Sequence, residues 1–119
     1  MPTPIQITAG QTVLNAVLND TTTARALAAR LPMTVEGQRA EFDYCCIART
    51  ALETNPAELQ DGWTNGDLLY GGGWFAILFA GQEQSKSYRD QMIVGHLEEG
   101  ELARVRALGA NESFTLSLR

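Results

Sequence analysis

The chain has 119 residues, of which 45% are hydrophobic, and a formal net charge of −5 at neutral pH. This length and composition predict a single domain over residues 1–119 with a packed core, and they exclude an intrinsically disordered chain. The nine basic residues are scattered along the sequence rather than clustered, so a nucleic-acid partner is not expected.

The N-terminal stretch MPTPIQITAGQ has neither the positive region nor the apolar region of a secretory signal. No apolar run in the sequence approaches the roughly 18 residues that a membrane-spanning helix needs, so a membrane is not an expected partner. We therefore expect a cytoplasmic protein.

Two strands and a helix are predicted at the start of the chain. Apolar residues alternate on both sides of a Gly10-Gln11 turn, which predicts a pair of strands within residues 5–18. Asp20 and the three threonines after it offer N-caps for a helix, and apolar residues then repeat at helical spacing over residues 24–31. Pro32 ends this helix, because the residue before a proline avoids helical geometry.

Residues 33–48 return to an extended pattern and contain both cysteines of the chain. Alternation places Phe42, Tyr44 and Cys46 on one face of a strand and Cys45 on the other. Neighbouring cysteines on a strand point in opposite directions, so no disulfide is expected between them. No further Cys or His stands at metal-ligand spacing, so no metal site is expected there.

A long loop and an unusual pair of strands follow. The stretch Thr50–Asn65 has little periodicity, which predicts a surface loop or a lid. The next stretch, GDLLYGGGWFAILFAG, places Gly71-Gly72-Gly73 between two apolar strands, and we expect these glycines to form a bend or bulge in the sheet. Residues 74–80 carry no polar side chain, so the strand face outside the core needs cover from a helix, a partner subunit or a ligand. We expect the Trp74 face to be a dimer interface or the floor of a groove.

The end of the chain predicts a strand at 92–97, a helix at 98–107 and a strand at 114–118. Together with the earlier elements, this order gives a mainly β fold of about eight strands and two helices. An open sheet of this size would expose its edges. We therefore predict a closed antiparallel β-barrel with two helices capping the ends.

The order of these elements resembles the cyclophilin-like barrel. The stretch TTTARALAARLP stands where cyclophilins carry the helix that plugs one barrel end, and IVGHLEEGELARV is similar to their late strand, acidic-glycine turn and helix. The stretch GDLLY followed by ILFAG resembles the prokaryotic cyclophilin-like domain families of uncharacterised function. The resemblance covers residues 5–118 and implies a cyclophilin-like β-barrel in a prokaryotic protein.

The sequence differs from that of the cyclophilins that are peptidyl-prolyl isomerases. Those enzymes carry an F-H-R element on the third strand and a Q-G-G element soon after it. This chain reads EFDYCCIART on the corresponding strand and contains no Q-G-G. In that family an arginine polarises the amide beside an apolar proline pocket, and Arg49 is the only arginine in the second half of this strand. A divergent peptidyl-prolyl isomerase is therefore an alternative and not the main expectation.

The expected function is a barrel that binds a small molecule or a short peptide without evident catalysis; a structural homo-oligomer is a further alternative. No catalytic residue, metal or cofactor is expected, because one histidine cannot form a His-rich metal site and no nucleophile motif is present. Five residues are expected to bind the ligand: an arginine on an outer strand face, the histidine, and aromatic residues beside glycine turns. They are Arg49, Trp63, Trp74, Tyr88 and His96. A homodimer would form through the Trp74 face.

Overall fold

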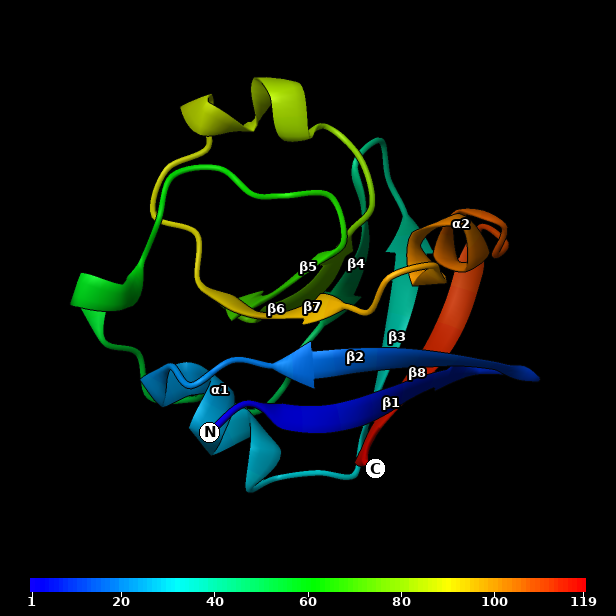
Figure 1. Cartoon of the computed structure of the whole chain (residues 1–119), viewed down its shortest axis with the longest axis horizontal. Coiled ribbons are helices and arrows are strands. Elements are labelled where there is room, and N and C mark those ends of the chain that lie inside the picture. Colours follow the sequence, from blue (N-terminus) through cyan, green and yellow to red (C-terminus); the bar gives the residue numbers. More distant parts are fainter.

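The computed structural model describes residues 1–119 and contains a closed barrel of eight strands. The strands lie in the order β1-β2-β7-β5-β6-β4-β3-β8, and every neighbouring pair is antiparallel (Figure 1). This confirms the predicted mainly β, closed barrel. The strands are β1 (Thr3–Ala9), β2 (Thr12–Leu18), β3 (Met33–Arg39), β4 (Asp43–Ile47), β5 (Asp67–Gly71), β6 (Trp74–Leu78), β7 (Ile93–Leu97) and β8 (Asn111–Leu118).

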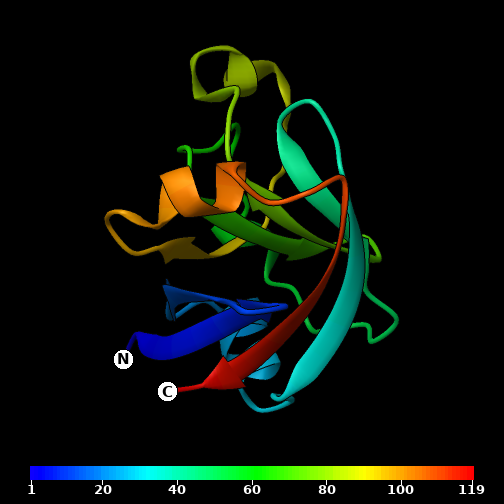
Figure 2. The same cartoon turned by 90° about the vertical axis from the view of Figure 1, so that its right-hand side faces the viewer.

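Two short helices, α1 (Thr22–Ala28) and α2 (Glu101–Arg106), lie at opposite ends of the barrel (Figures 1 and 2). Helix α1 begins where the threonine run predicts, because the Thr21 side chain accepts a hydrogen bond from the Ala24 backbone N–H at 3.2 Å. Each helix buries apolar side chains in the core, such as Leu27 from α1 and Val105 from α2. No helix of the chain is long and apolar enough to cross a membrane.

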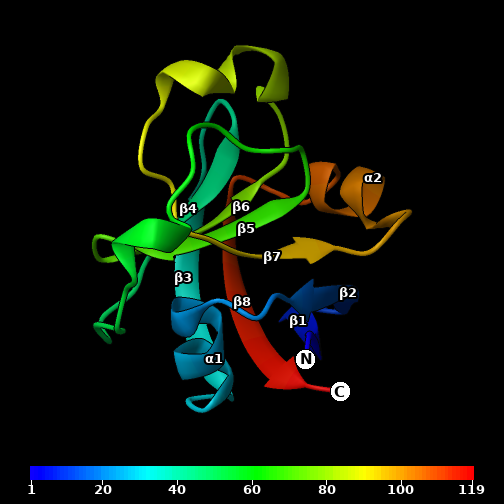
Figure 3. The same cartoon turned by 60° about the vertical axis from the view of Figure 1, so that its left-hand side comes forward.

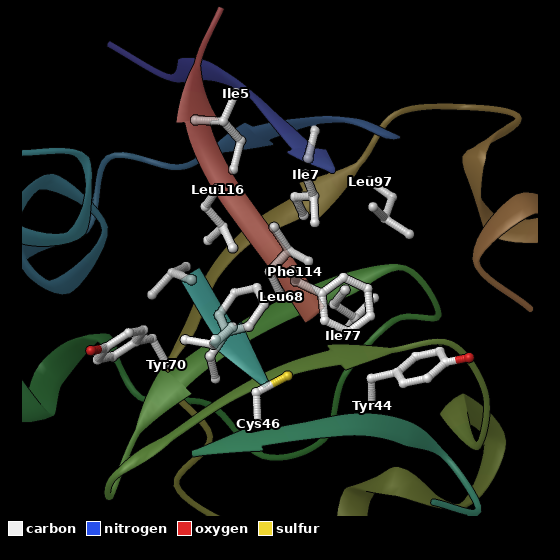
Figure 4. Packing of buried hydrophobic residues seen from close by; sticks show 14 of the residues in the cluster. Ile5, Ile7, Tyr44, Cys46, Leu68, Tyr70, Ile77, Leu97, Phe114 and Leu116 are labelled. Carbon is white, nitrogen blue, oxygen red and sulfur yellow. The ribbon is translucent and has the colours of Figure 1, made fainter. Parts of the chain in front are cut away.

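The barrel interior is one hydrophobic core of 23 buried residues. Successive side chains of a strand point to opposite faces, and β1, β2 and β8 bury alternate residues accordingly. In Figure 4, Ile7, Phe114 and Leu116 point into the interior from one wall, and Leu68 and Ile77 point toward them from β5 and β6. The core therefore uses only the inner face of each strand.

The triple glycine forms the turn of a β-hairpin. Gly71 pairs with Trp74, which leaves Gly72 and Gly73 as a two-residue loop between β5 and β6. Their φ angles are 61° and 88°, and such a pair of positive values is typical of the type I′ turn that matches the twist of a hairpin. The bend or bulge expected from the sequence is therefore wrong at this position.

One glycine of the barrel wall is needed because a side chain at its position would not fit, and not because of its backbone angles. Gly95 of β7 pairs with Leu18 of β2, and a Cβ atom on Gly95 would lie 2.5 Å from the carbonyl oxygen of Val17. The obstacle is backbone, so only a movement of β2 away from β7 could relieve it.

Replacing this glycine, Gly95→Ala, is expected to lower the free energy of unfolding by about 1–3 kcal/mol, the usual cost of overpacking. Urea denaturation followed by circular dichroism measures the loss. Gly71→Ala is the matched control on β5, because its nearest heavy atom, Met92 Cβ, would lie at an ordinary 3.6 Å. Equal losses in the two variants would contradict the close approach of β2 and β7.

Candidate functional site

The outer face of the barrel changes from polar to apolar across four neighbouring strands. Gln38 of β3, Cys45 of β4, Ala76 of β6 and Leu69 of β5 are successive partners in the sheet, so they form one row on the outer face. The row is polar at β3 and apolar at β6 and β5. The apolar part would be exposed to water if nothing covered it.

The cover comes from two loops of the same chain. The segments 60–63 and 88–91 run antiparallel and are joined by backbone hydrogen bonds. Gln60 N–H donates to the Gln91 carbonyl at 3.0 Å, and Gly62 N–H donates to the Tyr88 carbonyl at 2.9 Å. We call this pair the loop ribbon. Figures 1 and 3 show both loops beyond the β5–β6 hairpin, on the side away from β1 and β8.

Trp63 of the loop ribbon is the centre of a second, small hydrophobic cluster outside the barrel. It is 7% exposed and packs with Leu78 of β6 and Ile93 of β7. Its indole N–H donates to the Ala80 carbonyl at 2.8 Å, and its backbone N–H donates to the Ser85 hydroxyl at 3.0 Å. The outer face of β6 is thus covered in part by the chain itself, a cover that the sequence analysis did not consider.

The cover is incomplete and leaves a hollow of about 370 Å³, which we call the apolar hollow. Three aromatic rings stand over it: the centroids of Trp63 and Tyr88 are 5.2 Å apart, and Phe42 lies 6.1 Å from Trp63. Trp74 and Tyr88 remain 45% and 47% exposed. The lining residues are Ala40, Glu41, Phe42, Asp43, Cys45, Trp63, Leu69, Trp74, Ala76, Leu78, Tyr88 and Gln91.

A second hollow of about 520 Å³ adjoins the first, and Cys45 and Trp74 line both. We call it the polar hollow, because its other lining residues are largely polar. They come from β3, β4 and β8 and their ends: Glu36, Gly37, Gln38, Ile47, Asn111, Glu112 and Ser113. The two hollows together form a groove across the outer face of the barrel, with Trp74 at its middle.

Asp43 lies in the apolar hollow without a partner. Its carboxylate makes no hydrogen bond or salt bridge within the chain, whereas Glu36 and Glu112 of the polar hollow accept hydrogen bonds from Ser113 and Gly109. Burial raises the pKa of Asp43 above its usual value. The titratable side chains that line this hollow with it are those of Glu41, Cys45 and Tyr88, and no Lys or Arg lines it.

The two cysteines point to opposite faces of β4, as the alternation predicts. Cys46 is buried in the barrel, and burial raises its pKa to about 12. Cys45 faces the groove, where burial and the neighbouring Asp43 raise its pKa as well. Both side chains therefore stay thiols at neutral pH, which does not favour nucleophilic chemistry. No group of three or more His, Cys, Asp and Glu side chains is arranged to hold a metal ion.

The structure brings together three of the five residues expected at the binding site. Trp63, Trp74 and Tyr88 all line the apolar hollow. Arg49 lines a smaller hollow of about 200 Å³ between β3 and the end of β4, which shares Glu36 and Ile47 with the polar hollow. His96 lies on the outer face of β7, where its Nδ1 is 2.7 Å from Asp67 Oδ1. Arg49 therefore borders the polar end of the groove without lining either of its hollows, and His96 lies apart from both. A part of these two residues in binding stays a prediction.

Phe42 is a groove residue that the sequence analysis placed on the same strand face as Tyr44. The chain turns tightly before β4, where the Ala40 N–H donates to the Asp43 carbonyl at 2.7 Å. This turn breaks the alternation, and Phe42 packs against Trp63 outside the barrel. Asp43 and Leu69 were not among the expected binding residues either. The hollow that they line forms only when the loop ribbon folds over β5 and β6.

Comparison with known proteins gives a family and a similar fold. The model of a family described as the cyclophilin-like family matches residues 7–119. The solution structure of a hypothetical protein from Archaeoglobus fulgidus superposes with a TM-score of 0.72 at 17% sequence identity, and the match covers 98% of this chain and 95% of that one. Among curated proteins, none matches this sequence. At this identity the structural likeness concerns the fold alone.

Replacement of the unpartnered carboxylate, Asp43→Asn, is expected to stabilise the protein at neutral pH. The pKa of Asp43 is raised above 3.8 in the folded chain, so the unfolded chain loses this proton at a lower pH than the folded chain does. The free energy of unfolding therefore falls as the pH rises from 3.8 to the raised pKa. The amide of the variant does not ionise and avoids this loss. Thermal melts of both proteins should diverge above pH 3.8, with the variant melting at the higher temperature.

The control for this comparison is Glu99→Gln, which removes a negative charge from an exposed position. It should not reproduce the pH-dependent divergence. Equal melting temperatures of the Asp43→Asn variant and the unmodified protein at neutral pH would contradict the account of a desolvated carboxylate.

Proposed function

The chain belongs to the cyclophilin-like family, and we propose that it is a binding module that holds a small molecule or a short peptide in the apolar hollow. The observation that carries this proposal is the partly covered outer face of β6. Its floor is formed by Leu69, Ala76 and Leu78, and aromatic side chains of the loop ribbon stand over it. A hollow of about 370 Å³ is in the size range of small-molecule sites.

The exposure of two aromatic rings supports binding at this place. Trp74 and Tyr88 are nearly half exposed at the edge of the apolar hollow, while Ala76 and Leu78 beneath them are only 4% exposed. An apolar ligand seated on this floor would remove more of both rings from water, which is favourable in proportion to the area buried. Aromatic side chains at the edge of a concave surface are also the residues that most often dominate binding energy.

The chemistry of the hollow favours binding over catalysis. Proline isomerisation by an arginine requires that arginine to reach the amide of the bound ligand, and Arg49 does not line either hollow of the groove. Cys45 carries a raised pKa and remains a thiol. The groove therefore supports recognition of a ligand, without a group placed to transform it.

The test is a screen of blocked tetrapeptides and small aromatic molecules by thermal shift, followed by titration of every hit. A ligand that binds the native state raises its melting temperature. Tyr88→Ala should weaken each genuine hit by about tenfold, because it removes one aromatic side of the hollow. Tyr88 is 47% exposed, so the variant should still fold.

Leu118→Ala is the control, because it truncates an equally exposed apolar side chain outside the groove. Hits whose affinity is the same in the Tyr88→Ala variant would bind elsewhere and would overturn the proposed site. A screen of both ligand classes with no saturable hit would overturn the proposed function.

A further inference from the structure

We propose that the occupant of the groove is an extended peptide segment that pairs a hydrophobic side chain with a lysine or arginine, and that Asp43 binds the cationic group. This inference rests on the proposed binding function and specifies its ligand. The hydrophobic side chain would occupy the apolar hollow. The peptide backbone would cross Trp74 and enter the polar hollow.

The lining of the groove carries negative charge. It includes the carboxylates of Glu36, Glu41, Asp43 and Glu112 and no Lys or Arg. An anionic ligand would meet like charges on both sides of Trp74, whereas a cationic one would find opposite charges. Complementary potentials of this kind determine which partners can approach and bind a surface.

Cations close to the groove in sequence are engaged elsewhere and do not neutralise it. Arg89 follows Tyr88, but its Nε lies 3.5 Å from Asp61 Oδ2. Arg39 follows Gln38, but its guanidinium lies 4.5 Å from the centroid of the Phe79 ring. The carboxylates that line the groove therefore have no Lys or Arg beside them in its lining.

Asp43 has no partner for its carboxylate within the chain. It is the acidic residue of the apolar hollow that is partly removed from water, and it has no hydrogen-bond or ion-pair partner. Its oxygens keep contact with water, since no buried side-chain oxygen of the chain lacks a hydrogen-bond partner, and they are free to accept from a ligand. A ligand ammonium or guanidinium beside it would supply both the missing charge and the missing hydrogen-bond donors.

The side chains of the polar hollow favour a peptide over a small amine as the occupant of the groove. The polar hollow offers Gln38 and Asn111, whose side-chain amides both donate and accept hydrogen bonds, and Ser113, whose hydroxyl donates to Glu36 and can still accept. Such groups match the alternating N–H and C=O groups of a peptide backbone. A small aromatic amine would fill the apolar hollow and leave the polar hollow unused.

A second copy of this chain is a less suitable occupant of the same face. Two copies that met through Trp74 would bring two sets of these carboxylates together without an intervening cation. Like charges opposed across an interface disfavour association. Light scattering at binding concentrations checks this point, and a dimer that the Trp74→Ala variant abolishes would overturn the peptide assignment.

The two tryptophans of the chain both line the apolar hollow, so intrinsic fluorescence reports occupancy directly. The main probe is the blocked peptide Ac-Ala-Phe-Ala-Lys-NH₂, in which the Phe and Lys side chains lie on the same side of an extended backbone. Companion probes replace Lys by Glu, or Phe by Ala, or reverse the order of Phe and Lys. A fifth probe is 2-phenylethylamine.

At least one order of the Phe–Lys peptide should bind saturably and about tenfold or more tightly than its Glu counterpart, as expected for a desolvated ion pair. Asp43→Asn should abolish most of that preference while the Glu peptide binds no worse than before. Glu99→Gln, which removes a charge outside the groove, should leave the preference unchanged.

The outcomes separate this inference from the proposed function. Equal binding of the Lys and Glu peptides, or a preference that survives in Asp43→Asn, would overturn the cationic specificity and leave the binding function intact. If 2-phenylethylamine bound as tightly as the Phe–Lys peptide, the assignment to a peptide would be wrong. If neither the peptides nor the amine changed the fluorescence, the proposed function would fail as well.

Discussion

The arrangement of this protein depends on one constraint: strand β6 is apolar on both faces, and a closed barrel buries only one of them. Phe75 and Ile77 fill the barrel, so Ala76 and Leu78 face outward. The hydrophobic effect then requires a second cover. The chain meets this need by folding its own loops over the strand, where Trp63 forms the centre of a small second core.

The groove forms where the loops stop covering the outer face of β6. Ala76 and Leu78 are only 4% exposed, whereas Trp74 at the start of β6 is 45% exposed, so the hollow has a buried apolar floor and an open edge at Trp74. The sheet turns polar at β4, and Asp43 lies at that boundary with its charge uncompensated. Burial of this carboxylate disfavours its charged form, and such a cost to stability is common at binding sites. Our proposals assign that cost to recognition of a cation.

Much of the fold could be predicted from the sequence, because alternation and helical spacing are local patterns that the barrel preserves. The N-terminal strand pair and the Thr21 cap are examples. The groove could be predicted only in part. Trp63 and Tyr88 lie 25 residues apart in sequence and meet through the ribbon pairing of their loops, and no local pattern encodes that pairing. The direction of a side chain on a strand also does not tell which hollow it borders: Arg49 lines the hollow next to the groove and not the groove itself.

The most direct test of the central claim is an NMR measurement of contacts between the bound Phe–Lys peptide and the floor of the hollow. Our account predicts intermolecular nuclear Overhauser effects from the peptide phenylalanine ring to the methyl groups of Ala76 and Leu78, both of which line the apolar hollow. Contacts of the ring with the surface around Arg49 or His96, and none with these methyl groups, would contradict it.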